Sequence, residues 1–102
     1  MSLTGDDRLA AASLAVKQAH LCFQEKRTND GVMFLHVALN ELAKPVINEV
    51  DPVSVIGCLS AVTNQAATAK TIGAPAREIN EIAARTAELK RKAVVRSTSG
   101  AK

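Results

Sequence analysis

The stretch AKTIGAPAREINEI, from Ala69 to Ile82, decides how this chain folds. It places Gly73 and Pro75 two residues apart between two segments that contain many good helix formers. Glycine commonly follows the last residue of a helix, and proline is favoured at the first position of the next one. We therefore expect an αα-hairpin around Gly73-Pro75, at the end of an all-α fold built as a small bundle of about four amphipathic helices.

Start signals place further helices before this hairpin. Asp51 followed by Pro52 combines a capping residue with a first-turn proline, so a third helix begins there. Its apolar seam comprises Val55, Leu59, Val62, Ala66 and Ala69. Near the N-terminus, Thr4 is followed three residues later by Asp7, which predicts a first helix from Thr4 to about Lys26.

The second helix contains the most regular apolar pattern of the chain. Its seam, in alternate steps of three and four residues, comprises Val32, Leu35, Leu39, Leu42 and Val46. Asn29 or Asp30 is expected to cap its start. Pro45 interrupts the pattern, because a proline inside a helix removes a hydrogen bond at a cost of about 3 kcal/mol. The helix either bends at Pro45, or stops near Ala43 and restarts with Pro45 in a new first turn.

The first helix carries two apolar stripes on different sides. One stripe comprises Leu9, Val16, His20 and Phe23, and the other comprises Leu14 and Leu21. Two stripes require two packing partners, which are either two neighbouring helices or one helix and a second subunit. His20 is accordingly expected to be a core or interface histidine.

The composition fits a single helical domain. Of the 102 residues, 47% are hydrophobic but only 2% are aromatic, and because much of the apolar content is alanine, the helices must approach one another closely. We expect one domain over residues 1–95 and a disordered basic tail over residues 96–102, since RSTSGAK has too little apolar content to fold. The lack of tryptophan and tyrosine excludes an aromatic platform for single-stranded nucleic acid.

Other features favour a cytoplasmic protein without a cofactor. No apolar run approaches about 18 residues, so no membrane partner is expected, and the start of the chain lacks the basic and apolar regions of a signal peptide. Cys22 and Cys58 have no CxxC spacing and are expected to be small buried apolar residues rather than a disulfide. No metal site is predicted, because His20 and Cys22 point apart on a helix.

Basic residues gather towards the C-terminus. The formal net charge is +3, and the cations that follow Glu88 without an intervening acid are Lys90, Arg91, Lys92, Arg96 and Lys102. Such a segment suits nucleic acid or an acidic protein surface. Alternatively, these cations only complement the dipole of the last helix. Glu88 is expected to pair with Lys92, four residues later.

A second interpretation makes the opening stretch a DNA-binding motif. A helix-turn-helix needs a small residue in its first helix, an apolar residue just before a turn glycine, and two apolar positions in its second helix. Because Ala69, Ile72, Gly73, Ala74, Ile79 and Ile82 follow that order, the stretch resembles the helix-turn-helix signature of bacterial and phage regulators. The resemblance implies a motif from Gln65 to Arg91, with Asn64 as its first cap. Its DNA contacts would come from Arg77, Asn80, Arg85, Lys90, Arg91 and Lys92.

The second helix also carries a polar row, in which His36, Asn40 and Lys44 recur every fourth residue. An exposed histidine can accept a phosphoryl group, and the chain resembles small histidine-containing phosphotransfer domains in size and helical class. Those domains place a lysine and a glycine shortly after the histidine, where this chain has Leu39 and Asn40. A solvated polar face is the simpler interpretation, and phosphotransfer on His36 is an alternative.

The sequence contains no arrangement typical of an enzyme. Serine, histidine and acidic residues do not form a recognisable catalytic pattern, and no glycine-rich phosphate loop is present. We expect a non-enzymatic protein-interaction or regulatory protein that binds a protein partner and self-associates as a homo-oligomer, such as a homodimer. A helix-turn-helix DNA-binding transcriptional regulator is the first alternative to this prediction.

Overall fold

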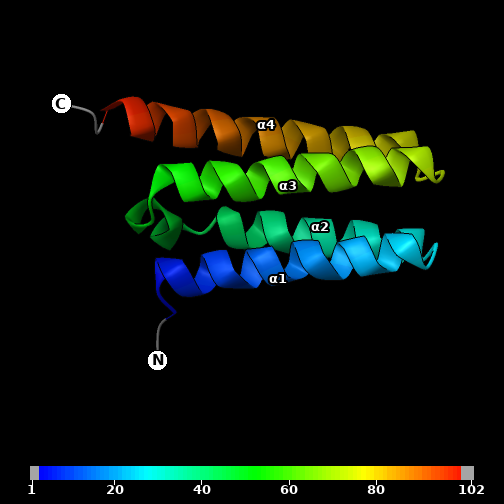
Figure 1. The fold of residues 1–102 in the computed structure, drawn as a ribbon. Helices are drawn as coiled ribbons and strands as arrows, with labels where there is room; N and C mark the ends of the chain where they lie inside the picture. Colours follow the sequence, from blue (N-terminus) through cyan, green and yellow to red (C-terminus); the bar gives the residue numbers. More distant parts are fainter. Residues whose placement is uncertain (1–2, 100–102) are drawn as a thin grey trace.

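The computed structural model describes residues 3–99 and contains four α-helices and one short 3-10 helix (Figure 1). In chain order these are α1 (Gly5–Gln24), α2 (Thr28–Leu42), η1 (Pro45–Glu49), α3 (Pro52–Thr71) and α4 (Ala76–Ser99). Residues 3–99 include no β-strand, so the predicted all-α bundle is confirmed. No helix in this part of the chain has both the length and the apolar content that a transmembrane span requires.

The hairpin formed by α3 and α4 is the one that the sequence predicts. α3 continues without a break from Pro52 to Thr71, and Gly73 adopts a φ of 100°. Glycine reaches this left-handed conformation without steric cost. The N–H groups of Gly73 and Ala74 donate to the carbonyls of Lys70 and Ala69 at 3.2 and 2.9 Å, which closes the end of the helix. α4 then runs back along α3 (Figure 1).

The predicted caps of α1 and α3 are confirmed. Thr4 Oγ1 accepts from Asp7 N–H at 3.1 Å, and Asp7 Oδ2 accepts from Thr4 N–H at 3.0 Å. These hydrogen bonds lower the pKa of Asp7, because they favour its charged form. At the start of α3, Asp51 Oδ1 accepts from Val53 N–H at 3.1 Å. Each cap satisfies a backbone donor that the first helical turn leaves without a partner.

The start of α2 differs from the prediction. The helix begins at Thr28, so the residue before it is Arg27, and neither Asn29 nor Asp30 caps it. Lys26 adopts a φ of 63°, which turns the chain sharply after α1. Asp30 instead accepts two hydrogen bonds from the Arg27 guanidinium, at 3.0 and 2.9 Å. The Asp30 carboxylate therefore binds the Arg27 side chain and does not accept a hydrogen bond from a backbone N–H group, as a capping residue would.

Pro45 ends one helix and starts another. α2 stops at Leu42 and Pro45 begins η1, which confirms the second of the two predicted alternatives. η1 packs against the start of α1, where Gly5 is buried beside Val46 and Val50. A Cβ atom at Gly5 would lie 2.5 Å from the Val46 carbonyl oxygen, so only glycine fits there.

The four helices form two hairpins that pack together. α1 packs mainly against α2, and α3 packs mainly against α4 (Figure 1). α2 also contacts both helices of the second hairpin. The Cα atoms span 44 × 29 × 16 Å, so the bundle is flat. Its largest fully buried side chains are those of Phe23, Leu35, Leu39, Leu59, Ile82 and Val62. Buried alanines, namely Ala12, Ala15, Ala19 and Ala38, allow the helices to approach closely.

α4 extends beyond the predicted end of the ordered domain. The expected boundary lay at residue 95, whereas the helix continues to Ser99. Arg96 holds this segment, because its Nη1 donates to the carbonyls of Asn48 and Val50 at 2.7 and 3.0 Å. Its charge also complements the dipole near the end of the helix. Residues 100–102 of the predicted tail lie outside the described residues.

Candidate functional site

The structure divides the polar row predicted on α2. His36 and Asn40 face α4, where Arg85 contacts both residues. Arg85 Nη1 lies 3.0 Å from His36 Nδ1, and Nη2 donates to Asn40 Oδ1 at 2.7 Å. Lys44 lies beyond the end of α2, immediately before η1, and therefore does not share their helical face. Two residues of the row thus contribute to one site and the third does not.

Two acidic residues of α4, which the sequence interpretation missed, complete this site. Glu78 Oε2 lies 3.5 Å from His36 Nε2, and the ligand atoms of His36, Glu78 and Glu81 all lie within 4.8 Å of one another. Glu78, Glu81 and Arg85 are three and four residues apart, so they share one face of α4. That spacing was visible in the sequence, but it did not indicate that α2 lies opposite. We call the following five residues the polar cluster: His36, Asn40, Glu78, Glu81 and Arg85.

The hydrogen bonds of the polar cluster determine the tautomer of His36. A guanidinium group can only donate, so Nδ1, which faces Arg85, acts as the acceptor. The proton of the neutral ring then lies on Nε2, which faces Glu78. In this arrangement neither ring nitrogen offers the free lone pair that a metal ion or a phosphoryl group requires. Phosphotransfer on His36 stays a prediction, which acid-labile labelling by a phosphodonor would test.

The predicted DNA-contacting residues lie on different sides of α4. Arg77 and Asn80 are exposed on the outer side. Arg85 faces α2 within the polar cluster, whereas Lys90 faces α3, where its Nζ lies 3.5 Å from Ser60 Oγ. A recognition helix presents its reading residues on a single face. The six predicted residues therefore do not form one continuous surface.

The ion pair predicted between Glu88 and Lys92 is replaced by another. Arg91 Nη2 donates to Glu88 Oε1 at 2.6 Å, so Glu88 pairs with a residue three positions away instead of four. The guanidinium fork of arginine can hold a carboxylate with two N–H groups, which an ammonium group cannot do. This pairing lowers the pKa of Glu88 and raises that of Arg91. Lys92 instead borders a cavity beside η1.

The backbone around Asn64 is that of a continuous helix. A helix-turn-helix from Gln65 to Arg91 requires a new helix to start after Asn64, whereas α3 passes through this residue without interruption. Asn64 contributes a carbonyl that accepts from Thr68 Oγ1 at 3.3 Å, as residues in the middle of a helix do. Of the two interpretations of the opening stretch, the structure has the geometry of the hairpin.

The outer sides of α1 and α2 expose large apolar side chains. Leu14 and Leu21 of α1 are 58% and 50% exposed. Met33 and Val37 of α2 are 54% and 40% exposed. The second apolar stripe predicted on the first helix is therefore not buried by the neighbouring helices within residues 3–99. We call Leu14 and Leu21 the outer stripe of α1.

His20 is not a core residue, in contrast to part of the prediction. It is exposed on α1, whereas Val16 of the same stripe is buried. His20 and Leu21 border a shallow depression together with Gln65 of α3. Gln65 Oε1 is buried and has no hydrogen-bond partner among the described residues. Buried acceptors of this kind are rare in proteins.

Both cysteines are buried and free, as predicted. Ser13 Oγ of α1 lies 3.8 Å from Cys58 Sγ of α3, within hydrogen-bond distance for sulfur. Burial raises the pKa of the Cys58 thiol, because it disfavours the charged thiolate. Cys58 therefore serves as a small apolar residue at the contact between α1 and α3.

No protein-family model, curated protein or solved structure matches this chain.

Proposed function

We propose that this chain is a non-enzymatic protein-interaction protein of the cytoplasm that pairs with a second copy of itself through the outer stripe of α1. The proposal rests on the exposure of Leu14 and Leu21. More than half of the surface of Leu14 and half of the surface of Leu21 are exposed to water. Full burial of a leucine side chain contributes about 1.5–3 kcal/mol. Two such residues on one helix face therefore leave apolar surface that the folded single chain does not bury and that a partner can cover.

The spacing of the outer stripe suits a symmetric pair of helices. Leu14 and Leu21 are seven residues apart, which is close to two helical turns, so they lie one above the other on α1. When two α1 helices pack antiparallel about a two-fold axis, Leu14 of one copy meets Leu21 of the other. Such an interface uses the same patch on both copies, which is the commonest symmetry of soluble oligomers.

Light scattering after size-exclusion chromatography tests this proposal. We expect twice the mass of one chain for the unchanged protein and the mass of one chain for the double variant Leu14→Glu, Leu21→Glu. The matched control carries the same added charge at two exposed valines elsewhere, Val53→Glu and Val94→Glu, and should stay dimeric. A single-chain mass for the unchanged protein at every concentration, or an equal effect of both double variants, would overturn the proposal.

Duplex DNA binding through α4 is the alternative that the exposure of Arg77 and Asn80 supports. Contacts with phosphates release counterions, so affinity that depends on them falls steeply as salt increases. We would measure retention on duplex DNA over a series of salt concentrations, with Arg77→Gln as the variant. A protein that is not retained even at low salt does not bind DNA in this way.

A further inference from the structure

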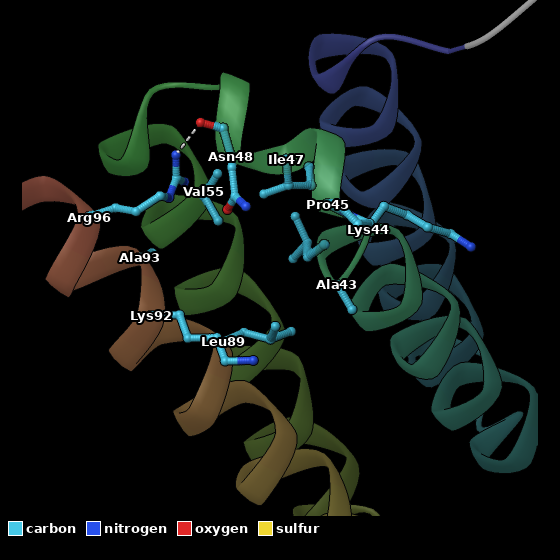
Figure 2. A pocket seen from close by; sticks show the side chains of 11 residues that line it. Ala43, Lys44, Pro45, Ile47, Asn48, Val55, Leu89, Lys92, Ala93 and Arg96 are labelled. Atoms are coloured by element: carbon cyan, nitrogen blue, oxygen red, sulfur yellow. Dashed lines mark hydrogen bonds between the residues drawn. The ribbon is translucent and has the colours of Figure 1, made fainter.

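A cavity of about 230 Å³ lies where η1, the end of α2 and the last turns of α4 meet (Figure 2). Apolar side chains line it, among them Ile47 and Val55, which are 4% and 2% exposed. Lys92 and Arg96 of α4 line it as well, and Figure 2 shows both on the same side of the cavity. Within residues 3–99, no carboxylate-bearing side chain lines it.

Arg96 is held in place by groups that do not neutralise it. Its Nη1 donates to the carbonyls of Asn48 and Val50 at 2.7 and 3.0 Å, which uses both hydrogens of that nitrogen. A guanidinium group has five N–H donors. Among the described residues, no acceptor contacts Nε or Nη2 of Arg96, and no acid forms an ion pair with it. Three donors in a fixed orientation therefore remain available beside the cavity.

Lys92 adds a second positive charge one helical turn earlier. Its expected partner, Glu88, is engaged by Arg91, and within residues 3–99 no carboxylate lies within ion-pair distance of the Lys92 ammonium. Figure 2 shows the Lys92 nitrogen beside Leu89 and the Arg96 guanidinium beside Asn48. Four residues correspond to a rise of about 6 Å along a helix, so the flexible Lys92 side chain can turn towards an anion that Arg96 holds. Lys44 also borders the cavity, but Figure 2 shows its side chain pointing away.

We propose that this cavity binds a small organic carboxylate that carries a compact apolar body. The carboxylate lies between Lys92 and Arg96, where the Arg96 guanidinium can donate two parallel hydrogen bonds. The apolar body covers Pro45 and Leu89, which line the cavity and are less buried than Ile47. Inorganic phosphate would leave this apolar wall in contact with water, and a neutral hydrocarbon would leave the two cations without a counter-charge.

The size of the cavity limits the ligand to that of an aromatic acid. A dry cavity of about 150 Å³ is enough to bind benzene. The volume of about 230 Å³ therefore accommodates one ring together with a carboxylate group. Benzoate is the simplest compound that combines these features.

Amide resonances of the isotope-labelled full chain, followed during titration with sodium benzoate, test this proposal. We expect saturable shifts confined to residues 42–55 and 89–96. Benzamide has the same shape without the charge, and sodium sulfate supplies charge without the ring, so neither should reproduce these shifts. Equal shifts from benzamide or from sulfate, or no saturable shift from benzoate, would overturn the proposal.

Two matched variants distinguish a built site from general attraction to a basic chain. Lys92→Gln is expected to weaken benzoate binding at least about tenfold, since it removes a charge-assisted hydrogen bond. Lys90→Gln removes the same charge two residues away, on the side of α4 that faces α3, and should leave the affinity within about twofold. Equal losses in the two variants would show that benzoate only follows net charge and would refute the assignment.

Discussion

The inner and outer faces of α1 differ in an unexpected way: the inner face buries small side chains and the outer face exposes large ones. Ala12 and Ala19 are completely buried, whereas Leu14 and Leu21 are at least half exposed. Small residues on the inner face let the backbones of neighbouring helices approach closely. The core between them is then filled by backbone atoms and small side chains instead of large side chains. Hydrophobicity alone therefore does not determine which face of α1 belongs to the core.

The largest expected effect comes from the one aromatic side chain on the inner face. Phe23 is 2% exposed and its ring lies against Gly31 of α2. Phe23→Ala should lower the free energy of unfolding by about 3–5 kcal/mol, because it loses buried apolar surface and leaves a cavity. Urea denaturation measures this loss. A loss below about 1 kcal/mol would mean that the alanines alone hold α1 in place.

Enlarging an inner alanine should have the next largest effect. Ala19→Leu introduces a bulky side chain at a position that is 0% exposed, and we expect destabilisation by about 1–3 kcal/mol. The same substitution at exposed Ala10 is the control, and it should change stability by less than about 0.5 kcal/mol. Equal effects at the two positions would contradict the distinction between the faces. Thermal unfolding of both variants gives the comparison.

Two glycines extend the comparison beyond α1 and predict changes of opposite sign. Gly57 lies inside α3 with no atom near the position of a Cβ, so Gly57→Ala should stabilise the protein by about 0.5–1 kcal/mol through helix propensity. A Cβ at Gly31 would collide with the Phe23 ring, so Gly31→Ala should destabilise it. Chemical denaturation of both variants tests the pair. Stabilisation by Gly31→Ala would show that the contact between α1 and α2 is loose.

The smallest expected change in stability is at the outer stripe. Leu14→Ala removes a side chain that is 58% exposed, so unfolding of the single chain at low protein concentration should shift by no more than about 0.5 kcal/mol. At high concentration the same variant should weaken pairing, because the interface loses an apolar contact. Denaturation curves at several concentrations separate these effects. A large loss at low concentration would place Leu14 in the core.

Features set by neighbouring residues were predictable from the sequence. Gly73 and Pro75 predict the hairpin because a left-handed glycine and a first-turn proline are local requirements. The end of α2 shortly before Pro45 follows from a missing N–H group in the same way. His20 was placed on the core stripe because periodicity gives the angle of a residue around the helix, but not whether a neighbouring helix covers it.

The candidate sites depend on which helices lie opposite each other, and periodicity does not determine this. Glu78 and Glu81 join His36 only because α4 lies beside α2. Likewise, the sequence shows Lys92 and Arg96 only as part of a basic segment. In the structure they line one side of a cavity, because η1 lies opposite them. The expected ion pair of Glu88 and Lys92 follows the general rule that helical residues four apart are neighbours. In the structure, Arg91 forms the ion pair with Glu88 instead.

The bonds from Arg96 to the carbonyls of Asn48 and Val50 join segments that the ribosome makes at different times. α1 and α2 pack on each other as consecutive elements, so their hairpin can assemble while the rest of the chain is still being synthesised. The connection that leads from this hairpin to the next gains its hydrogen bonds from Arg96 only when the end of α4 has emerged. The central connection between the two hairpins is therefore fixed only after α4 has been synthesised.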